Sequence, residues 1–255
     1  MRSSEIILFA QGEVGSKVTS WLLEHYPNDI AVFVGNPDLI PLSIQQANRI
    51  QIIDSTNESE ILSSLATTGR EVNLGVLAWW PHVIGPELLS VPTLGYVNMH
   101  PSFLPYNRGV NPNFWAIVDG TPFGVTLHLA SVELDGGPII AQRSIDIEWT
   151  DTGESLYKKA RSEIFNLFIE VYPGLRSPEF IQTTLPQQEL SAIRHSGEMQ
   201  RTSVLDLDSR SSVREVLNLL RARTFKGYPG CRFEDNDRHY EVAITITETD
   251  RCKTL

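Results

Sequence analysis

The sequence holds 255 residues, of which 41% are hydrophobic and 20% charged; these proportions are ordinary for a globular protein of one medium domain, with or without a small second one. The formal net charge of −10 produces a field that repels phosphate polymers, so we expect no nucleic-acid partner. Two cysteines give neither a disulfide scaffold nor a metal framework, and the lack of a signal-peptide core or of a run of ~18 apolar residues predicts a cytoplasmic protein with no membrane partner.

Short apolar runs alternate with amphipathic segments in the N-terminal part of the chain. The apolar runs predict strands at residues 5–10, 30–34, 50–53 and 74–80. Helical spacing of apolar residues predicts helices at 16–26, 42–47 and 58–66. This βαβ alternation is typical of an α/β protein with a Rossmann-like, mostly parallel sheet.

A glycine-containing turn is expected at residues 11–15, between the first strand and the first helix. Gly12 and Gly15 have G-x-x-G spacing instead of the full G-x-G-x-x-G, and no acidic residue follows the second strand. We therefore interpret the two glycines as a tight turn that lets the helix pack closely, and not as a dinucleotide site.

The C-terminal part of the chain changes character. A strand is predicted at 139–147 and a long helix from Asp151 or Thr152 to about Tyr172, ended by Pro173-Gly174. Residues 180–198 read as a boundary strand and linker. Ser212 to Glu215 is a capping box that opens a helix, and residues 231–247 predict a hairpin or meander. We predict a catalytic domain at 1–185, a linker at 186–200 and a small α+β domain at 201–255.

Polar side chains gather in the stretch from Asn98 to Asp135. Asn98 and His100 are two residues apart on a predicted strand, so their side chains point the same way. Asp135 directly precedes the turn Gly136-Gly137-Pro138, after a second β-rich run at 125–129. Two strand ends could therefore converge on one point, as in the sites of α/β folds.

Several chemistries are compatible with these residue types. A Ser/His/Asp arrangement would use Ser102, but no G-x-S-x-G elbow surrounds it. A metal site would use His100, His128 and Asp135, but these residues lack a metal-binding spacing. Acyl transfer by direct attack of an amine fits better, with an amide donor for the oxyanion and a His/Asp pair for the proton. The residues alone equally allow Asn98 and His100 merely to satisfy strand ends.

A motif in this stretch resembles the 10-formyltetrahydrofolate-dependent formyltransferases. The resemblance covers about residues 5–175 and rests on N-M-H-P-S-F-L-P from Asn98, Arg108-Gly109, and the later Gly124-Val125-Thr126 and Leu134-Asp135-Gly136-Gly137. It implies the formyltransferase fold, 10-formyltetrahydrofolate as cosubstrate, no metal, and catalytic roles for Asn98, His100 and Asp135. It also implies a folate pocket formed by Trp79, Trp80, Val83, Ile84, Ala130, Glu133 and Asp135.

The acceptor implied by this resemblance depends on the tail. Methionyl-tRNA formyltransferases carry a larger, basic C-terminal domain, whereas this short tail is similar to those of enzymes that formylate nucleotide-linked amino sugars. Such an acceptor would be contacted by Arg108, Gly109, Asn111 and Asn113, and family members often form homodimers. A methionyl-tRNA formyltransferase-like enzyme, a formyltetrahydrofolate hydrolase and a noncatalytic folate- or nucleotide-binding module remain alternatives. Asn107 stands where the family usually has Tyr, and Asp135 precedes Gly136 where it often has Thr.

Overall fold

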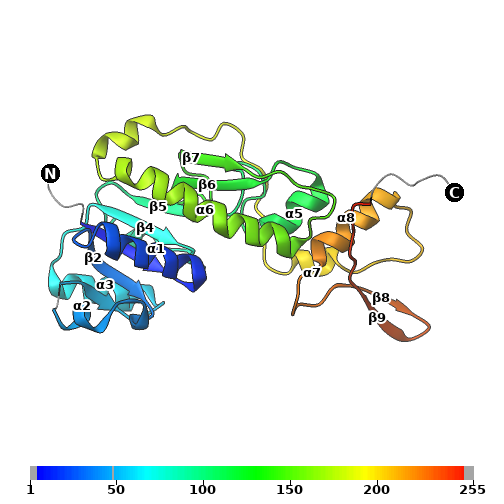
Figure 1. The fold of residues 1–255 in the computed structure, drawn as a ribbon, viewed down its shortest axis with the longest axis horizontal. Helices are drawn as coiled ribbons and strands as arrows, with labels where there is room; N and C mark the ends of the chain where they lie inside the picture. Colours follow the sequence, from blue (N-terminus) through cyan, green and yellow to red (C-terminus); the bar gives the residue numbers. More distant parts are fainter. Residues whose placement is uncertain (1–4, 48, 250–255) are drawn as a thin grey trace. The chain divides into compact units, whose positions relative to one another are not determined.

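The structure, a computed structural model, describes residues 5–47 and 49–249 of the chain (Figure 1). These residues form two compact units. The first unit is made from the described residues of Met1–His100, Thr126–Gln142 and Glu163–Gln188; the second is made from those of Pro101–Val125, Arg143–Ser162 and Glu189–Leu255. The C-terminal segment thus shares its unit with two earlier stretches, and the domain boundaries near residues 185 and 200 stay a prediction.

A seven-stranded sheet organises the described part of the chain. Its strands are β1 (Ile6–Ala10), β2 (Ile30–Gly35), β3 (Gln51–Ile53), β4 (Leu74–Ala78), β5 (Tyr96–His100), β6 (Gly124–Leu129) and β7 (Ile139–Ser144), in the spatial order β3-β2-β1-β4-β5-β6-β7. The pairs from β3 to β5 are parallel, and β6 is antiparallel to β5. The predicted Rossmann-like, mostly parallel sheet is confirmed. Every residue of β1 and of β4 is buried, as expected for strands covered on both faces.

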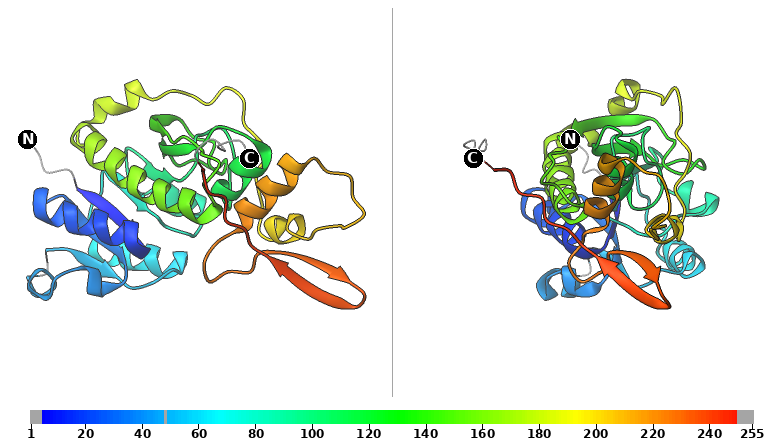
Figure 2. Two further views of the ribbon diagram at one scale, coloured as in Figure 1. Left: turned by 45° about the vertical axis from the view of Figure 1, so that its right-hand side comes forward. Right: turned by 90° about the vertical axis from the view of Figure 1, so that its right-hand side faces the viewer.

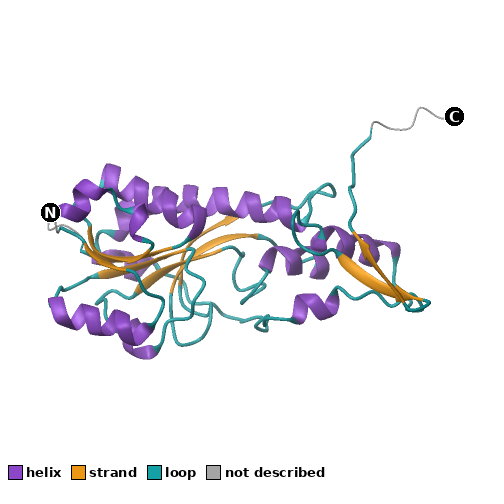
Figure 3. Ribbon diagram, turned by 90° about the horizontal axis from the view of Figure 1, so that it is seen from below, coloured by secondary structure: helices purple, strands orange, loops and turns teal. Residues whose placement is uncertain are grey.

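Helices lie on both sides of this sheet (Figure 3). The first unit contains α1 (Gly12–His25), α2 (Leu42–Gln46), α3 (Glu58–Thr68), α4 (Pro86–Leu89) and most of α6 (Gly153–Leu175), with short 3₁₀ turns η1 (Pro37–Leu39) and η2 (Pro178–Thr183). Trp21 of α1 packs edge-on against Phe168 and Tyr172 of α6, so these two helices share one side of the sheet. None of the helices in the described ranges is long and apolar enough to cross a membrane.

The start of α1 corrects the predicted turn. Residues 12–15 are the first turn of the helix, so only Gln11 separates it from β1. The reason given for Gly15 is nevertheless confirmed, because a Cβ there would lie 2.9 Å from the carbonyl carbon of Ala10 and 3.0 Å from the carbonyl oxygen of Ala78. A side chain would push α1 away from the sheet.

Two predictions about the end of the catalytic part were wrong. Helix α6 continues through Pro173 to Leu175. Pro173 removes one hydrogen-bond donor in the final turn, and the turn is held from outside, because Tyr172 donates to Asp29 (2.9 Å) and Arg176 donates to the same carboxylate (2.7 Å). The boundary strand expected after residue 180 is instead η2 followed by an irregular segment.

The second unit contains α5 (Pro112–Asp119) and the C-terminal elements. The latter are α7 (Glu198–Thr202), α8 (Val213–Arg223), β8 (Cys231–Asp235) and β9 (Arg238–Val242). The capping box of α8 is confirmed, because Ser212 Oγ accepts from the Glu215 amide (3.2 Å) while the Glu215 carboxylate accepts from the Ser212 amide (2.7 Å). The predicted hairpin is also confirmed, and Asn236 and Asp237 turn it with φ of 49° and 60° (Figure 2).

Candidate active site

Four polar side chains occupy one face of the sheet where β5 meets β6. Asn98 lies directly opposite His128, and His100 lies opposite Thr126. Because Asn98 and His100 are two residues apart, and because opposite residues of an antiparallel pair share a face, all four side chains point the same way. The two histidines and Thr126 are buried. The sheet register therefore builds a polar cluster inside the first unit.

Asp135 reaches this cluster from the loop between β6 and β7, and not through the meeting of two strand ends that the sequence predicted. Since β6 is antiparallel to β5, its end lies beside the start of β5, and the Ala130 amide donates to the Tyr96 carbonyl (2.7 Å). The connection from β6 to β7 then folds back over the cluster. Its Asp135 carboxylate, in a residue only 8% exposed, lies 3.5 Å from His100 Nδ1 and 3.7 Å from His128 Nε2.

The hydrogen bonds of His128 fix the direction of the Asn98 amide. His128 Nδ1 lies 2.9 Å from the Leu129 carbonyl oxygen, which only accepts, so this nitrogen carries a proton in the neutral ring. His128 Nε2 is then an acceptor, and Asn98 Nδ2 donates to it over 3.1 Å. Asn98 thus turns its NH₂ group, which has a second N–H, toward the cluster. His128 was weighed in the sequence only as a metal ligand.

His100 holds a buried nitrogen without a partner. The residue is 6% exposed, and its Nε2 makes no hydrogen bond to any described residue, while Nδ1 faces Asp135. A buried polar atom left unsatisfied costs stability, and such atoms mark places where a ligand or a transferred proton belongs. The imidazole is arranged to accept a proton on Nε2 with a carboxylate behind it.

The two competing chemistries gain no support from the geometry. The Ser102 hydroxyl donates to the Tyr106 carbonyl, so its proton is directed at the backbone and not at an imidazole. Within the described ranges, no group of three His, Cys, Asp or Glu side chains is placed to hold a metal ion. The expectation that the protein uses no metal stays a prediction.

The residues expected to bind folate lie on two loops of the first unit. Trp79, with φ of 60°, and Trp80 follow β4, and Trp80 packs edge-on against Phe9 with ring centroids 5.2 Å apart. Val83 exposes 79% of its surface, whereas Ile84 packs partly against the core. The loop is fixed at its far end by Glu58, whose carboxylate accepts from the Gly85 amide over 2.7 Å. The other loop carries half-buried Ala130 and exposed Glu133.

The residues expected to bind the acceptor belong to the second unit. Arg108 is 2% exposed, and its guanidinium donates to the Ser191 carbonyl over 3.1 Å. Gly109 pairs with Arg194 at a φ of 90°, Asn111 precedes α5 at a φ of 57°, and Asn113 donates to the Gly153 carbonyl over 2.8 Å. The side chains of Arg108 and Asn113 thus make hydrogen bonds within that unit, and Gly109 and Asn111 serve its backbone turns.

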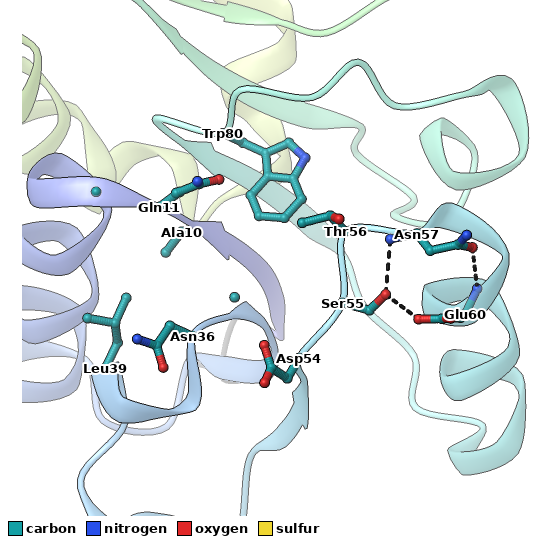
Figure 4. A pocket seen from close by; sticks show the side chains of 12 residues that line it. Ala10, Gln11, Asn36, Leu39, Asp54, Ser55, Thr56, Asn57, Glu60 and Trp80 are labelled. Atoms are coloured by element: carbon teal, nitrogen blue, oxygen red, sulfur yellow. Dashed lines mark hydrogen bonds between the residues drawn. The ribbon is translucent and has the colours of Figure 1, made fainter.

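A pocket of about 780 Å³ opens at the carboxyl ends of β1, β2 and β3 (Figure 4). Amides from Gln11 and Asn36, carboxylates from Asp54 and Glu60, and the Trp80 indole line it. The other lining residues are Ala10, Gly12, Gly35, Leu39, Ser55, Thr56 and Asn57. The lining has no Lys or Arg, so it offers hydrogen bonds to hydroxyl and amide groups in place of charge for a phosphate. This pocket was not predicted from the sequence, although the polar residues that follow three successive strands could have indicated it.

Comparison with known proteins identifies the family. A family model described as formyl transferase matches residues 28–172, which is more than half of the chain and includes Asn98, His100 and Asp135. The chain belongs to the formyl transferase family. A second model, described as the N-formyltransferase dimerization C-terminal domain, matches residues 198–248. The resemblance inferred from the Asn98 motif is confirmed.

Curated relatives of two kinds match the chain. The dTDP-4-amino-4,6-dideoxyglucose formyltransferase of Mycobacterium tuberculosis is 35% identical over 155 residues, or 61% of this chain and 65% of the relative. The methionyl-tRNA formyltransferase of a Thermotoga species is 30% identical over 210 residues, or 81% of this chain and 64% of the relative. The matches thus span just under two thirds of the length of each relative.

Solved structures share the fold. One from Mycobacterium tuberculosis, described as a candidate sugar N-formyltransferase, has a TM-score of 0.77 at 23% identity and covers 97% of this chain and 100% of its own. The N-formyltransferase of Helicobacter canadensis, solved with folinic acid and dTDP-3-aminofucose, has a TM-score of 0.62 at 18% identity and covers 91% and 84%. The predicted formyltransferase fold is confirmed.

Proposed function

We propose that this formyl transferase moves a formyl group from 10-formyltetrahydrofolate to the amine of a nucleotide-linked amino sugar. The single observation that carries the proposal is the buried imidazole of His100. Its Nε2 has no partner among the described residues, its Nδ1 faces Asp135 at 3.5 Å, and Asn98 lies beside it on the same face of the sheet. This is an amide donor next to a proton acceptor, which is what amine attack on a formyl carbon requires.

In the proposed mechanism, the neutral amine attacks the formyl carbon and forms a new C–N bond. The N–H of Asn98 that does not go to His128 donates to the oxyanion. His100 Nε2 takes the proton that the attacking nitrogen loses, and the Asp135 carboxylate stabilises the resulting imidazolium. Collapse of the intermediate breaks the bond to N10 of the folate, and the proton passes from His100 to N10.

Donor and acceptor are supported by the relatives. The Helicobacter enzyme is solved with folinic acid, a formylated folate, and with dTDP-3-aminofucose, and the Mycobacterium relative is named for a dTDP-linked amino sugar. We propose that the Trp79–Ile84 and Ala130–Asp135 loops receive the folate. We assign the pocket beside Gln11 and Asp54 to an uncharged, hydroxyl-rich part of the acceptor, because carboxylates and amides bind hydroxyl groups well. The carboxylates would repel a diphosphate, and the amides would not neutralise its charge. Contacts of the acceptor with Arg108, Gly109, Asn111 and Asn113 stay part of this proposal.

Methionyl-tRNA formylation is the second candidate. The Thermotoga relative favours it, because it matches 81% of this chain. The net charge of −10 weighs against it, since an acidic surface repels tRNA, and the match of residues 198–248 to the C-terminal domain of N-formyltransferases favours the sugar.

That domain match also supports a homodimer, as do the exposed apolar side chains of Val204, Leu207, Tyr228 and Tyr240. A cytoplasmic location fits the free buried thiol of Cys231.

An acceptor panel tests the proposal. The protein is incubated with 10-formyltetrahydrofolate and with dTDP-, UDP- or GDP-linked amino sugars, methionyl-tRNA, or no acceptor, and tetrahydrofolate release is followed. We expect release only with an amino sugar, and loss of release in His100→Ala but not in His25→Ala, an exposed histidine of α1. Release without an acceptor would indicate a hydrolase, release with methionyl-tRNA alone would favour the second candidate, and no release would leave only a binding module.

A further inference from the structure

Gln187 makes two hydrogen bonds to the loop that carries Asp135. Its Nε2 donates to the carbonyl oxygen of Asp135 over 2.9 Å and to that of Gly137 over 2.8 Å. Both N–H bonds of the amide are thereby directed at the backbone on either side of Gly136. All of these residues belong to the first unit, although Gln187 comes from the segment that the sequence marked only as a linker.

The loop needs such support because its backbone is strained at Asp135. This residue has a φ of 50°, a left-handed conformation that is uncommon for a residue with a Cβ, although Asp tolerates it better than most. Within the loop, the Gly136 amide donates to the Glu133 carbonyl over 3.0 Å, and the Leu129 amide donates to the Pro138 carbonyl over 2.9 Å. These bonds close the loop but contact neither the Asp135 nor the Gly137 carbonyl oxygen. The backbone conformation at Asp135 sets the direction of its Cα–Cβ bond, on which the carboxylate is carried.

Gln187 is itself held in place by a short pairing with β7. The Ile139 amide donates to the Leu185 carbonyl over 2.7 Å, and the Leu185 amide donates back over 2.8 Å. Because Gln187 follows Leu185 by two residues, this pairing brings its side chain alongside the residues that precede Ile139. The anchor consists of backbone atoms, so it survives a change of side chain at position 187.

The oxygen of the Gln187 amide indicates that the N–H groups are the part of this side chain that stabilises the loop. Gln187 Oε1 is buried and makes no hydrogen bond within the described part of the chain. An apolar side chain of the same shape would avoid that cost, so a Gln at this place is a net gain only through its two donated bonds.

We infer that Gln187 is a positioning residue, which fixes the backbone of Asp135 so that its carboxylate faces His100. It touches neither the reacting atoms nor His100, and it acts through Asp135. The inference deepens the proposed function and rests on it, because the importance of the Asp135 direction follows from the proton role of His100.

The test compares Gln187→Met with Gln188→Met in the full-length protein. The first variant keeps the length of the side chain and removes both donors, and the second makes the same change at the exposed neighbouring residue. We expect kcat for formyl transfer to fall about 10- to 100-fold in Gln187→Met, with KM changed less than about twofold, since a small misplacement of a catalytic group costs rate more than binding. Gln188→Met should match the wild-type protein.

A second measurement needs no substrate and keeps the inference separate from the proposed function. Imidazole ¹⁵N NMR at one fixed pH compares the two ring nitrogens of His100 in each protein. We expect the ¹⁵N chemical shifts of His100 to change in Gln187→Met and to match the wild-type values in Gln188→Met, because the carboxylate that faces Nδ1 turns away only in the first variant. Gln187→Leu, which also lacks both donors, should change them in the same way if Gln187→Met does not fold.

The outcomes separate two roles for Gln187. If kcat and the ¹⁵N chemical shifts of His100 both stay at their wild-type values while only the melting temperature falls, Gln187 is merely structural and the inference is overturned. If the wild-type protein transfers no formyl group to any acceptor, the proposed function fails, and the ¹⁵N chemical shifts still decide whether Gln187 directs Asp135.

Discussion

His100 Nδ1 and Asp135 Oδ1 lie 3.5 Å apart, although 35 positions separate the two residues in the chain. Both side chains are buried, and the opposite nitrogen of His100 has no partner among the described residues. A carboxylate behind a buried imidazole stabilises the protonated ring, so the pair is arranged to receive a proton from a substrate.

Asp135→Asn should lower kcat about 100-fold without unfolding the protein. Asn keeps the size of the side chain and tolerates the left-handed backbone at this position as well as Asp does. The amide cannot balance the charge of the imidazolium, so the loss falls on the proton-transfer step. Glu24→Gln removes a charge from an exposed residue of α1 and should keep wild-type kcat. Equal activities of the two variants would contradict the role given to Asp135.

His128→Phe should lower kcat about 10-fold or more, because Asn98 loses the acceptor that directs its amide. The matched variant is His128→Gln, whose Oε1 can accept the Asn98 N–H over a similar distance. Steady-state kinetics should therefore rank His128→Gln between the wild-type protein and His128→Phe. If the Phe variant is as active as the Gln variant, His128 only fills space.

Asp29→Asn should reduce the free energy of unfolding by about 1.5–3 kcal/mol, the range for a hydrogen bond to a charged group, because the Asp29 side chain is buried and that of Arg176 is only 28% exposed. The Asp29 carboxylate accepts hydrogen bonds from Tyr172 and Arg176, and it joins the end of α6 to the start of β2. The hydrogen bond to Asp29 raises the pKa of the Arg176 guanidinium, so this side chain stays charged and would lose its partner. Urea unfolding measures the effect, with exposed Asp38→Asn as the control. Similar losses in both variants would contradict the assignment.

Asp151 should contribute stability at neutral pH that disappears in acid. Burial opposes ionisation of its carboxyl, but hydrogen bonds from Lys159, Ser155 and the Glu148 amide outweigh burial and hold its pKa below the usual value. The unfolded chain therefore takes up a proton at a higher pH than the folded chain does. The stabilisation is complete above about pH 5 and is lost as the pH falls through the folded pKa.

Unfolding of Asp151→Asn at several pH values tests this sign. The difference in unfolding free energy from the wild-type protein should be constant between about pH 6 and 7 and should shrink below about pH 4. Asp146→Asn, at an exposed residue near the same helix start, should show a small difference throughout. A difference for Asp151→Asn that stays constant down to pH 3 would contradict the depressed pKa.

The features predicted well from the sequence depend on nearby residues. The βαβ order of β1, α1 and β2 follows from apolar spacing within short windows, and the capping box needs only Ser212 and Glu215. The common face of Asn98 and His100 likewise follows from the two-residue period of a strand.

The features missed depend on contacts between distant residues. Strand β6 pairs antiparallel with β5, which places His128 opposite Asn98. No local sequence pattern distinguishes such an antiparallel strand from a parallel one. Burial of Arg108 against the Ser191 carbonyl and the two bonds from Gln187 to the Asp135 loop each join positions at least 50 residues apart. The polar segment 186–200 reads as a linker partly because Gln187 and Ser191 donate to backbone carbonyls, and such partners leave no trace in the sequence.

The central claim, direct formyl transfer to an amino sugar at His100, is tested most directly with a ¹³C-formyl donor. A single turnover with the wild-type protein and the amino sugar selected from the acceptor panel is followed by NMR. The proposed mechanism predicts that the label appears in an N-formyl group on the sugar, with one tetrahydrofolate released per label, and that neither forms in His100→Ala. Label recovered as free formate, at the same rate with and without the sugar, would contradict it.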